Sequence, residues 1–91
     1  MPYISEPNRE KLCGARVAIK SSRLDTIGDV EYLFCLIADH YLSLHPFAFA
    51  TLNSIVGAFE CGKMEFYRKM ASVYEDGKEK ANGTVWTQGA E

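Results

Sequence analysis

Five side chains suited to binding chemistry recur at helical spacing in the second half of this 91-residue chain. They are Glu60, Lys63, Tyr67, Arg68 and Tyr74, which we call the polar strip. Offsets of three, seven and fourteen residues return to nearly the same side of an α-helix, so four of the five share a face and Arg68 lies at its edge. The strip would present a carboxylate, cations and two phenol rings with flat stacking faces.

The sequence leaves three interpretations of the polar strip open. Tyrosine and arginine are enriched in protein interfaces, so the strip can be a surface for a protein partner. Tyrosine also stacks on bases while lysine and arginine bind phosphate, so a nucleotide pocket is the second interpretation. In the third, Glu60 and Lys63 form an exposed pair three residues apart, and the tyrosines seal the core.

An apolar stripe runs along the same segment in alternating steps of four and three residues, the heptad spacing of a helix packed along its length. The stripe has seven positions, Leu52, Val56, Phe59, Lys63, Phe66, Met70 and Val73, and all but Lys63 are apolar. The exception, Lys63, can extend its ammonium group into solvent, set the register of an oligomer or line a polar cavity.

The helix that carries this stripe is expected to be longer than the domain that must cover it. A helix over residues 51–81 has roughly 31 residues and a length of about 46 Å, whereas a compact chain of this size has a diameter near 30 Å. We therefore expect a symmetric homo-oligomer formed through this helix. The expected contacts come from Phe59, Phe66, Met70 and Trp86, with Phe47 and Phe49 contributing from a turn before the helix.

Hydrophobic periodicity and capping signals predict an all-α fold of three helices in a single domain, residues 1–91. The helices are expected at about 6–21, 27–44 and 51–81, with the first two forming a short hairpin packed on the long third helix and with short extended tails at both ends. Ser5, Thr26 and Thr51 are the expected N-caps. The Asn82-Gly83 pair is typical of a helix C-terminus.

Composition excludes several classes of protein. The chain has 47% hydrophobic and 24% charged residues, which is ordinary for a folded protein, and its net charge of −2 makes nucleic acid an unfavourable partner. Cys13, Cys35 and Cys61 fit no metal or disulfide spacing, so we expect buried free thiols, no metal and no cofactor. No signal peptide or membrane span is evident, and we expect a cytoplasmic protein without membrane contact.

Several motifs resemble a family of small uncharacterised proteins encoded by tailed phages and prophages. The motifs are the opening Met1-Pro2-Tyr3-Ile4, the segment Glu60-x-x-Lys63-x-Glu65-Phe66-Tyr67-Arg68, the segment Tyr74-Glu75-Asp76-x-Lys78, and Asn82-Gly83. Val73 stands where members of that family commonly carry proline, so the sequence does not show whether the long helix is kinked there. The resemblance implies phage origin and an accessory role in the host cytoplasm, but it implies no activity.

No catalytic residues emerge from the sequence, and we expect a non-enzymatic protein. It is expected to bind itself and a host protein, and to block or modulate that host protein. Factors of anti-phage defence are the candidate class for this partner. An oligomeric sponge that sequesters a signalling nucleotide is the alternative. A further alternative is a magnesium-dependent nucleoside-triphosphate pyrophosphohydrolase, which needs several converging carboxylates. Asp25, Asp29, Glu31 and Glu60 are the acids available for such a site.

Overall fold

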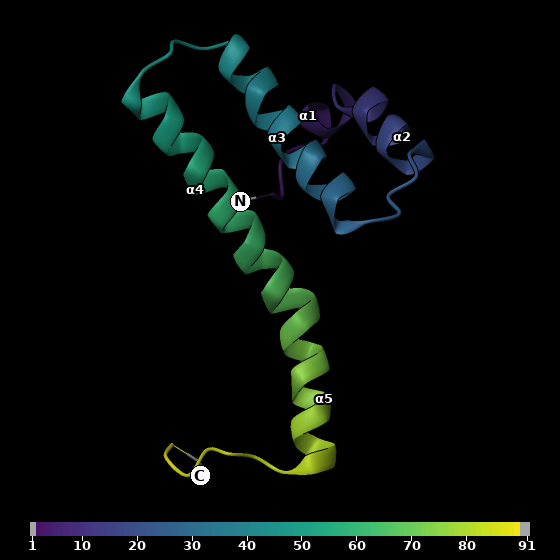
Figure 1. Cartoon of the computed structure of the whole chain (residues 1–91), viewed down its shortest axis with the longest axis vertical. Helices are drawn as coiled ribbons and strands as arrows, with labels where there is room; N and C mark the ends of the chain where they lie inside the picture. Colours follow the sequence, from purple (N-terminus) through teal and green to yellow (C-terminus); the bar gives the residue numbers. More distant parts are fainter. Residues whose placement is uncertain (1, 90–91) are drawn as a thin grey trace. The chain divides into compact units, whose positions relative to one another are not determined.

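The computed structural model describes residues 2–89 and is helical, with no strand in that range (Figure 1). The all-α prediction is therefore confirmed. The helices, in chain order, are α1 (Glu6–Glu10), α2 (Cys13–Ser21), α3 (Ile27–Ser43), α4 (Phe49–Phe66), the π-helical turn η1 (Tyr67–Ala71) and α5 (Ser72–Asn82). The predicted extended ends include Met1 and residues 90–91, which lie outside the described residues.

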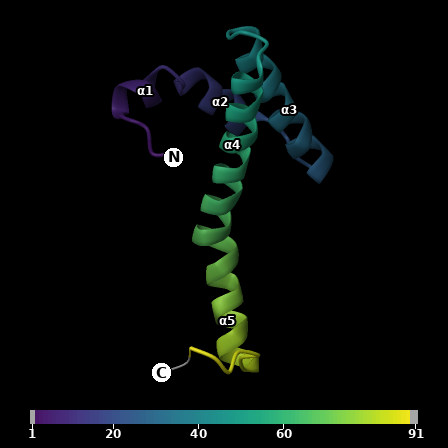
Figure 2. The same ribbon diagram turned by 90° about the vertical axis from the view of Figure 1, so that its left-hand side faces the viewer.

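The chain divides into two compact units, Met1–Ala58 and Phe59–Glu91. The first contains α1, α2, α3 and the beginning of α4, and α3 leads into α4 through a loop at residues 44–48 (Figure 2). The second contains the end of α4, η1, α5 and the tail. All five residues of the polar strip belong to the second unit.

The first predicted helix is wrong as one continuous element, because the chain breaks it at Lys11 and Leu12. The Lys11 amide donates to the Pro7 carbonyl at 3.3 Å, and the Leu12 amide donates to the Arg9 carbonyl at 3.1 Å. This second bond spans three residues and tightens the last turn of α1. Leu12 then adopts φ −100° and ψ 9°, outside the α-helical region, and a new helix starts at Cys13.

α3 begins with the reciprocal cap that the sequence predicts at Thr26. The Asp29 amide donates to Thr26 Oγ1 at 3.2 Å, and the Thr26 amide donates to Asp29 Oδ2 at 3.0 Å. Asp29 Oδ2 also accepts the Asp25 amide at 2.9 Å. The Asp29 carboxylate thus satisfies two backbone donors at the helix start.

α4 begins two residues earlier than predicted, at Phe49, so Thr51 lies within the helix and is not its cap. The Leu52 amide donates to the Ala48 carbonyl at 3.1 Å, which includes Ala48 in the first turn. Phe47 and Phe49 are each 81% exposed and do not cover a core within the chain.

A π-helical turn separates α4 from α5. In η1 the Ser72 amide donates to the Tyr67 carbonyl, five residues back, in place of the four-residue spacing of an α-helix. Such a turn accommodates one extra residue without breaking the helix. The helix irregularity closest to Val73 is therefore this π-helical turn, which ends at Ala71 directly before α5 begins at Ser72.

α5 ends at Asn82 as the Asn-Gly signal indicates. Gly83 adopts a φ of 95°, a conformation that glycine reaches without the steric cost of a side chain. Its amide donates to the Glu79 carbonyl at 2.7 Å, which closes the last turn. The tail through residue 89 is irregular.

No side chain in the described part of the chain is fully buried. Cys13, Cys35 and Cys61 are free but exposed, so the prediction of buried thiols is wrong. A thiol is buried only where a second element covers its helix face, and the described residues provide no such cover at these positions. The packing of a helical hairpin on the long helix stays a prediction, as does the single domain.

None of the described helices is both long enough and apolar enough to cross a bilayer.

Candidate binding surface

The polar strip lies on the end of α4, on η1 and on α5, and most of its members pair with near neighbours. Lys63 Nζ lies 2.8 Å from Glu60 Oε1, and both side chains are mostly exposed. This is the pair three residues apart that the sequence indicates. Because the pair is exposed, its contribution to stability is small.

Arg68 binds a carboxylate outside the polar strip. Its Nη2 lies 2.6 Å from Glu65 Oε1 and 3.2 Å from Glu65 Oε2. The Glu65 side chain is 18% exposed and that of Arg68 is 63% exposed, so the charge-assisted bonds hold the guanidinium along the helix surface. The spacing of three residues between Glu65 and Arg68 was the signal that could have identified this pair in the sequence.

The two tyrosines of the strip have different environments. Tyr67 Oη donates to Glu75 Oε1 at 2.6 Å, across eight residues. This hydrogen bond, followed by the negative charge of Glu75, raises the pKa of Tyr67 above its ordinary value. The Tyr74 ring instead lies under the Lys78 ammonium, 5.7 Å from the ring centroid, within cation–π range.

Neither tyrosine seals a core. Tyr67 is 52% exposed and Tyr74 is 67% exposed. The third interpretation of the strip is therefore correct for the Glu60–Lys63 pair and wrong for the tyrosines. Both phenol rings are exposed on the second unit, but the helix between them includes η1, which aligns Tyr67 with Glu75. The prediction that Tyr74 shares a face with Tyr67 is therefore wrong.

The residues expected to make oligomer contacts are also exposed. Phe66, Met70 and Trp86 retain 67%, 60% and 72% of their surface, and Phe59 retains 40%. A single helix with a tail cannot cover its own apolar side chains. These residues are therefore accessible to a partner.

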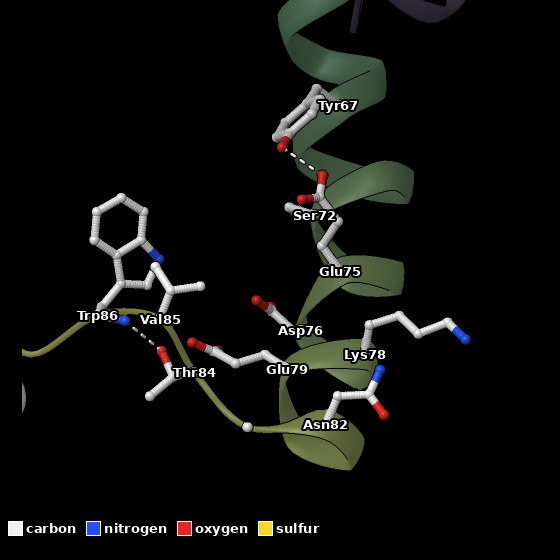
Figure 3. Close-up of a pocket in the computed structure, with 11 residues that line it drawn as sticks. Tyr67, Ser72, Glu75, Asp76, Lys78, Glu79, Asn82, Thr84, Val85 and Trp86 are labelled. Carbon is white, nitrogen blue, oxygen red and sulfur yellow. Dashed lines mark hydrogen bonds between the residues drawn. The ribbon is translucent and has the colours of Figure 1, made fainter.

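A shallow pocket of ≈ 410 Å³ lies between α5 and the tail within the second unit (Figure 3). Three carboxylates line it, those of Glu75, Asp76 and Glu79, and Lys78 is the only cation among the lining residues. Figure 3 shows Asp76 and Glu79 directed toward the tail and Lys78 directed away from it. The pocket is consequently negative, which disfavours a phosphate group.

Val85 and Trp86 form the tail side of this pocket (Figure 3). The Trp86 amide donates to Thr84 Oγ1 at 3.0 Å, which shapes the tail locally. With 72% of its surface exposed, Trp86 does not pin the tail to the helix within one chain. The sequence predicts a contact role for Trp86 but gives no signal for the three carboxylates across the pocket, because nothing in their spacing indicates that the tail returns beside them.

Two of the acids available for a magnesium site already have partners within their own unit. Asp29 is bound to backbone amides at the start of α3, and Glu60 is paired with Lys63. Among residues 2–89 no group of three or more His, Cys, Asp or Glu side chains is arranged to hold a metal ion.

Residues 1–85 match a protein family described as a domain of unknown function, DUF6899. The chain belongs to this family. No curated protein and no solved structure matches the chain. The family description names no activity.

Proposed function

We propose that this DUF6899 protein is a phage-encoded, non-enzymatic binding protein that self-associates through its C-terminal helix and blocks or modulates a host protein. The observation that carries the proposal is that the second unit leaves its large apolar side chains exposed, with Phe66, Met70 and Trp86 each retaining at least 60% of their surface. Burial of apolar surface is the dominant favourable term in folding. A helical unit that leaves such side chains exposed gains this stabilisation when another surface covers them.

The second unit identifies where association would occur. Apart from Val85 and Trp86 in the tail, its large apolar side chains lie on one helical run, and Phe66 and Met70 are each at least 60% exposed. Exposed apolar surface of this kind is typical of protein interaction sites. The only charged member of the apolar stripe, Lys63, is already neutralised by Glu60, so its charge does not oppose a neighbouring helix.

Light scattering coupled to size exclusion, with circular dichroism on the same fractions, tests self-association. We expect a folded oligomer whose helicity decreases as dilution dissociates it, since folding and association are linked. A strict monomer that keeps its full helicity at every concentration would refute this part of the proposal.

The host partner is proposed to bind the polar strip, where tyrosine and arginine side chains are exposed. Capture from host lysate by the wild-type protein is compared with capture by Tyr67→Ala and Arg68→Ala. Tyr32→Ala is the matched control, because Tyr32 on α3 is 67% exposed and lies outside the strip. Undiminished capture by both strip variants would refute the assignment of the strip.

The arrangement of charges favours a protein partner over a nucleotide. The two cations of the polar strip, Lys63 and Arg68, are each paired with a carboxylate three residues before them. The pocket beside α5 is lined by more carboxylates than cations. A thermal-shift panel of linear and cyclic nucleotides tests the alternative directly, because a ligand bound to the native state raises the melting temperature.

A further inference from the structure

We infer that η1 is a conformational device with two helical registers, in which the Ser72 hydroxyl and the Tyr67–Glu75 hydrogen bond hold the π-helical register. Loss of both contacts lets residues 67–71 return to α-helical geometry and turns α5 about the helix axis relative to the end of α4. The inference concerns the second unit alone. It does not depend on self-association or on a host partner.

Ser72 makes hydrogen bonds to two consecutive carbonyls of η1. Its amide donates to the Tyr67 carbonyl, five residues back, and its hydroxyl donates to the Arg68 carbonyl at 2.7 Å, four residues back. In an unbroken α-helix the Ser72 amide itself would donate to the Arg68 carbonyl. The hydroxyl therefore takes the place of the amide, which is free to bond one residue further back.

The hydroxyl bond by itself does not produce a π-helical turn. In α2, Ser21 Oγ donates to the Val17 carbonyl at 2.9 Å, again four residues back, and that segment is α-helical. The same side chain with the same bond is thus compatible with an α-helix. A second constraint must act together with Ser72 in η1.

The Tyr67–Glu75 hydrogen bond supplies this second constraint. The two residues are eight apart, and the bond between their side chains is 2.6 Å long. Two α-helical turns take up about 7.2 residues, and one extra residue in a π-helical turn raises this to about 8.2. Residues eight apart are therefore close to aligned in the π-helical register, whereas they lie roughly 80° apart in an unbroken α-helix. The π-helical register favours the bond, and the bond in turn stabilises that register.

The backbone around η1 is close to α-helical geometry. Phe66 has φ −61° and ψ −45°, and Ser72 has φ −65° and ψ −36°. Ala71, the last residue of η1, has φ −67° and ψ −42°. A change of register therefore needs small dihedral changes within five residues and no break in the helix. It would turn α5 by about one residue, or roughly 100°, relative to the end of α4.

This rotation would redirect the charged side of α5. Glu75, Asp76 and Glu79 lie on α5 and line the pocket beside the tail. Tyr67 is 52% exposed, so its bond to Glu75 can be reached from solvent. A contact that draws the Glu75 carboxylate away from Tyr67 would favour the α-helical register, because it removes one of the two contacts that hold the other.

The experiment compares the wild-type chain with the double variant Ser72→Ala, Tyr67→Phe, which removes both contacts and keeps the ring at position 67. Scalar coupling across the hydrogen bond, measured by nuclear magnetic resonance, identifies the carbonyl that accepts the amide of residue 72. We expect the carbonyl of residue 67 in the wild type. In the double variant this coupling should be lost, and coupling to the Arg68 carbonyl should appear. A crystal structure of each chain gives the same readout.

Two controls keep the contacts of η1. The pair Ser54→Ala, Tyr74→Phe removes the same two kinds of hydroxyl from α4 and α5 and should keep the wild-type coupling. Ser72→Thr should keep it as well, because a threonine hydroxyl can bond to the carbonyl four residues back. Loss of the coupling in either control overturns the assignment of the register to these contacts.

Three results for the other chains would overturn the inference. A double variant that keeps the bond to the carbonyl of residue 67 shows that the π-helical turn needs neither contact. A double variant whose residue-72 amide shows no coupling and exchanges freely with solvent shows that η1 has no α-helical alternative. A wild-type Ser72 amide bonded to the Arg68 carbonyl removes the starting register itself.

Discussion

The Asp29→Ala substitution gives the sharpest test of how the first unit is held together. Asp29 Oδ2 accepts two backbone amides, from Asp25 at 2.9 Å and from Thr26 at 3.0 Å. Its charge also lies in the first turn of α3, where the helix dipole favours an anion. Removing the carboxylate leaves both amides without their partner and removes that favourable interaction.

The expected loss follows from these contacts. Replacing a capping side chain costs about 0.5–2 kcal/mol, and the charge near the helix start adds about 0.3–1 kcal/mol. Because water can reach the amides, we expect a total of about 1–2 kcal/mol. For a chain of this size each kcal/mol lowers the melting temperature by roughly 4–8 °C.

Urea and thermal unfolding at one fixed protein concentration measure the effect, since association also contributes to stability. Glu31→Ala is the matched control, because it removes the same charge from α3 without removing a hydrogen bond to the Thr26 cap. We expect a change within about 0.5 kcal/mol for this control. Equal destabilisation by the two variants would refute the capping argument and leave only net charge as the cause.

Three further predictions concern the second unit. Gly83→Ala should destabilise the end of α5 by about 1 kcal/mol, because alanine is disfavoured at a φ of 95°. Amide hydrogen exchange at the helix end should become faster, and unchanged exchange would contradict this expectation. The raised pKa of Tyr67 means that folding favours the neutral phenol. The contribution of the Tyr67–Glu75 hydrogen bond to stability is therefore complete below the ordinary tyrosine pKa. It is lost as the pH rises through the pKa of Tyr67 in the folded protein. Glu75→Gln should move the ultraviolet titration of Tyr67 to lower pH, with Tyr67→Phe identifying the signal, and an unmoved titration would exclude Glu75 as the cause. Phe66→Asp should shift the elution of the protein toward the monomer, and an unchanged oligomer would remove Phe66 from the interface.

Local interactions explain which features the sequence predicted. The Thr26 cap, the Gly83 helix end and the Glu60–Lys63 pair each involve residues at most four apart. Interactions over such distances depend on the identity of neighbouring side chains and on helix geometry, both of which can be read from the sequence. The helical class of the protein follows in the same way from its hydrophobic periodicity.

Competing local signals explain the errors in helix boundaries. The predicted helix over 6–21 breaks at Leu12, although no proline or glycine occupies that position. Thr51 is a good capping residue, yet α4 includes it because the turn before it is already helical. Where several cap positions are chemically acceptable, the course of the backbone chooses among them.

The sequence by itself determined that this chain is helical, that Thr26 caps a helix and Gly83 ends one, and which aromatic and charged residues occur along the C-terminal helix. Only the three-dimensional structure decided which of those residues share a face. One extra residue in η1 rotates the helix beyond it, so Tyr67 meets Glu75 rather than sharing a face with Tyr74. A period read from the sequence assumes a constant number of residues per turn, and the backbone alone decides where that number changes.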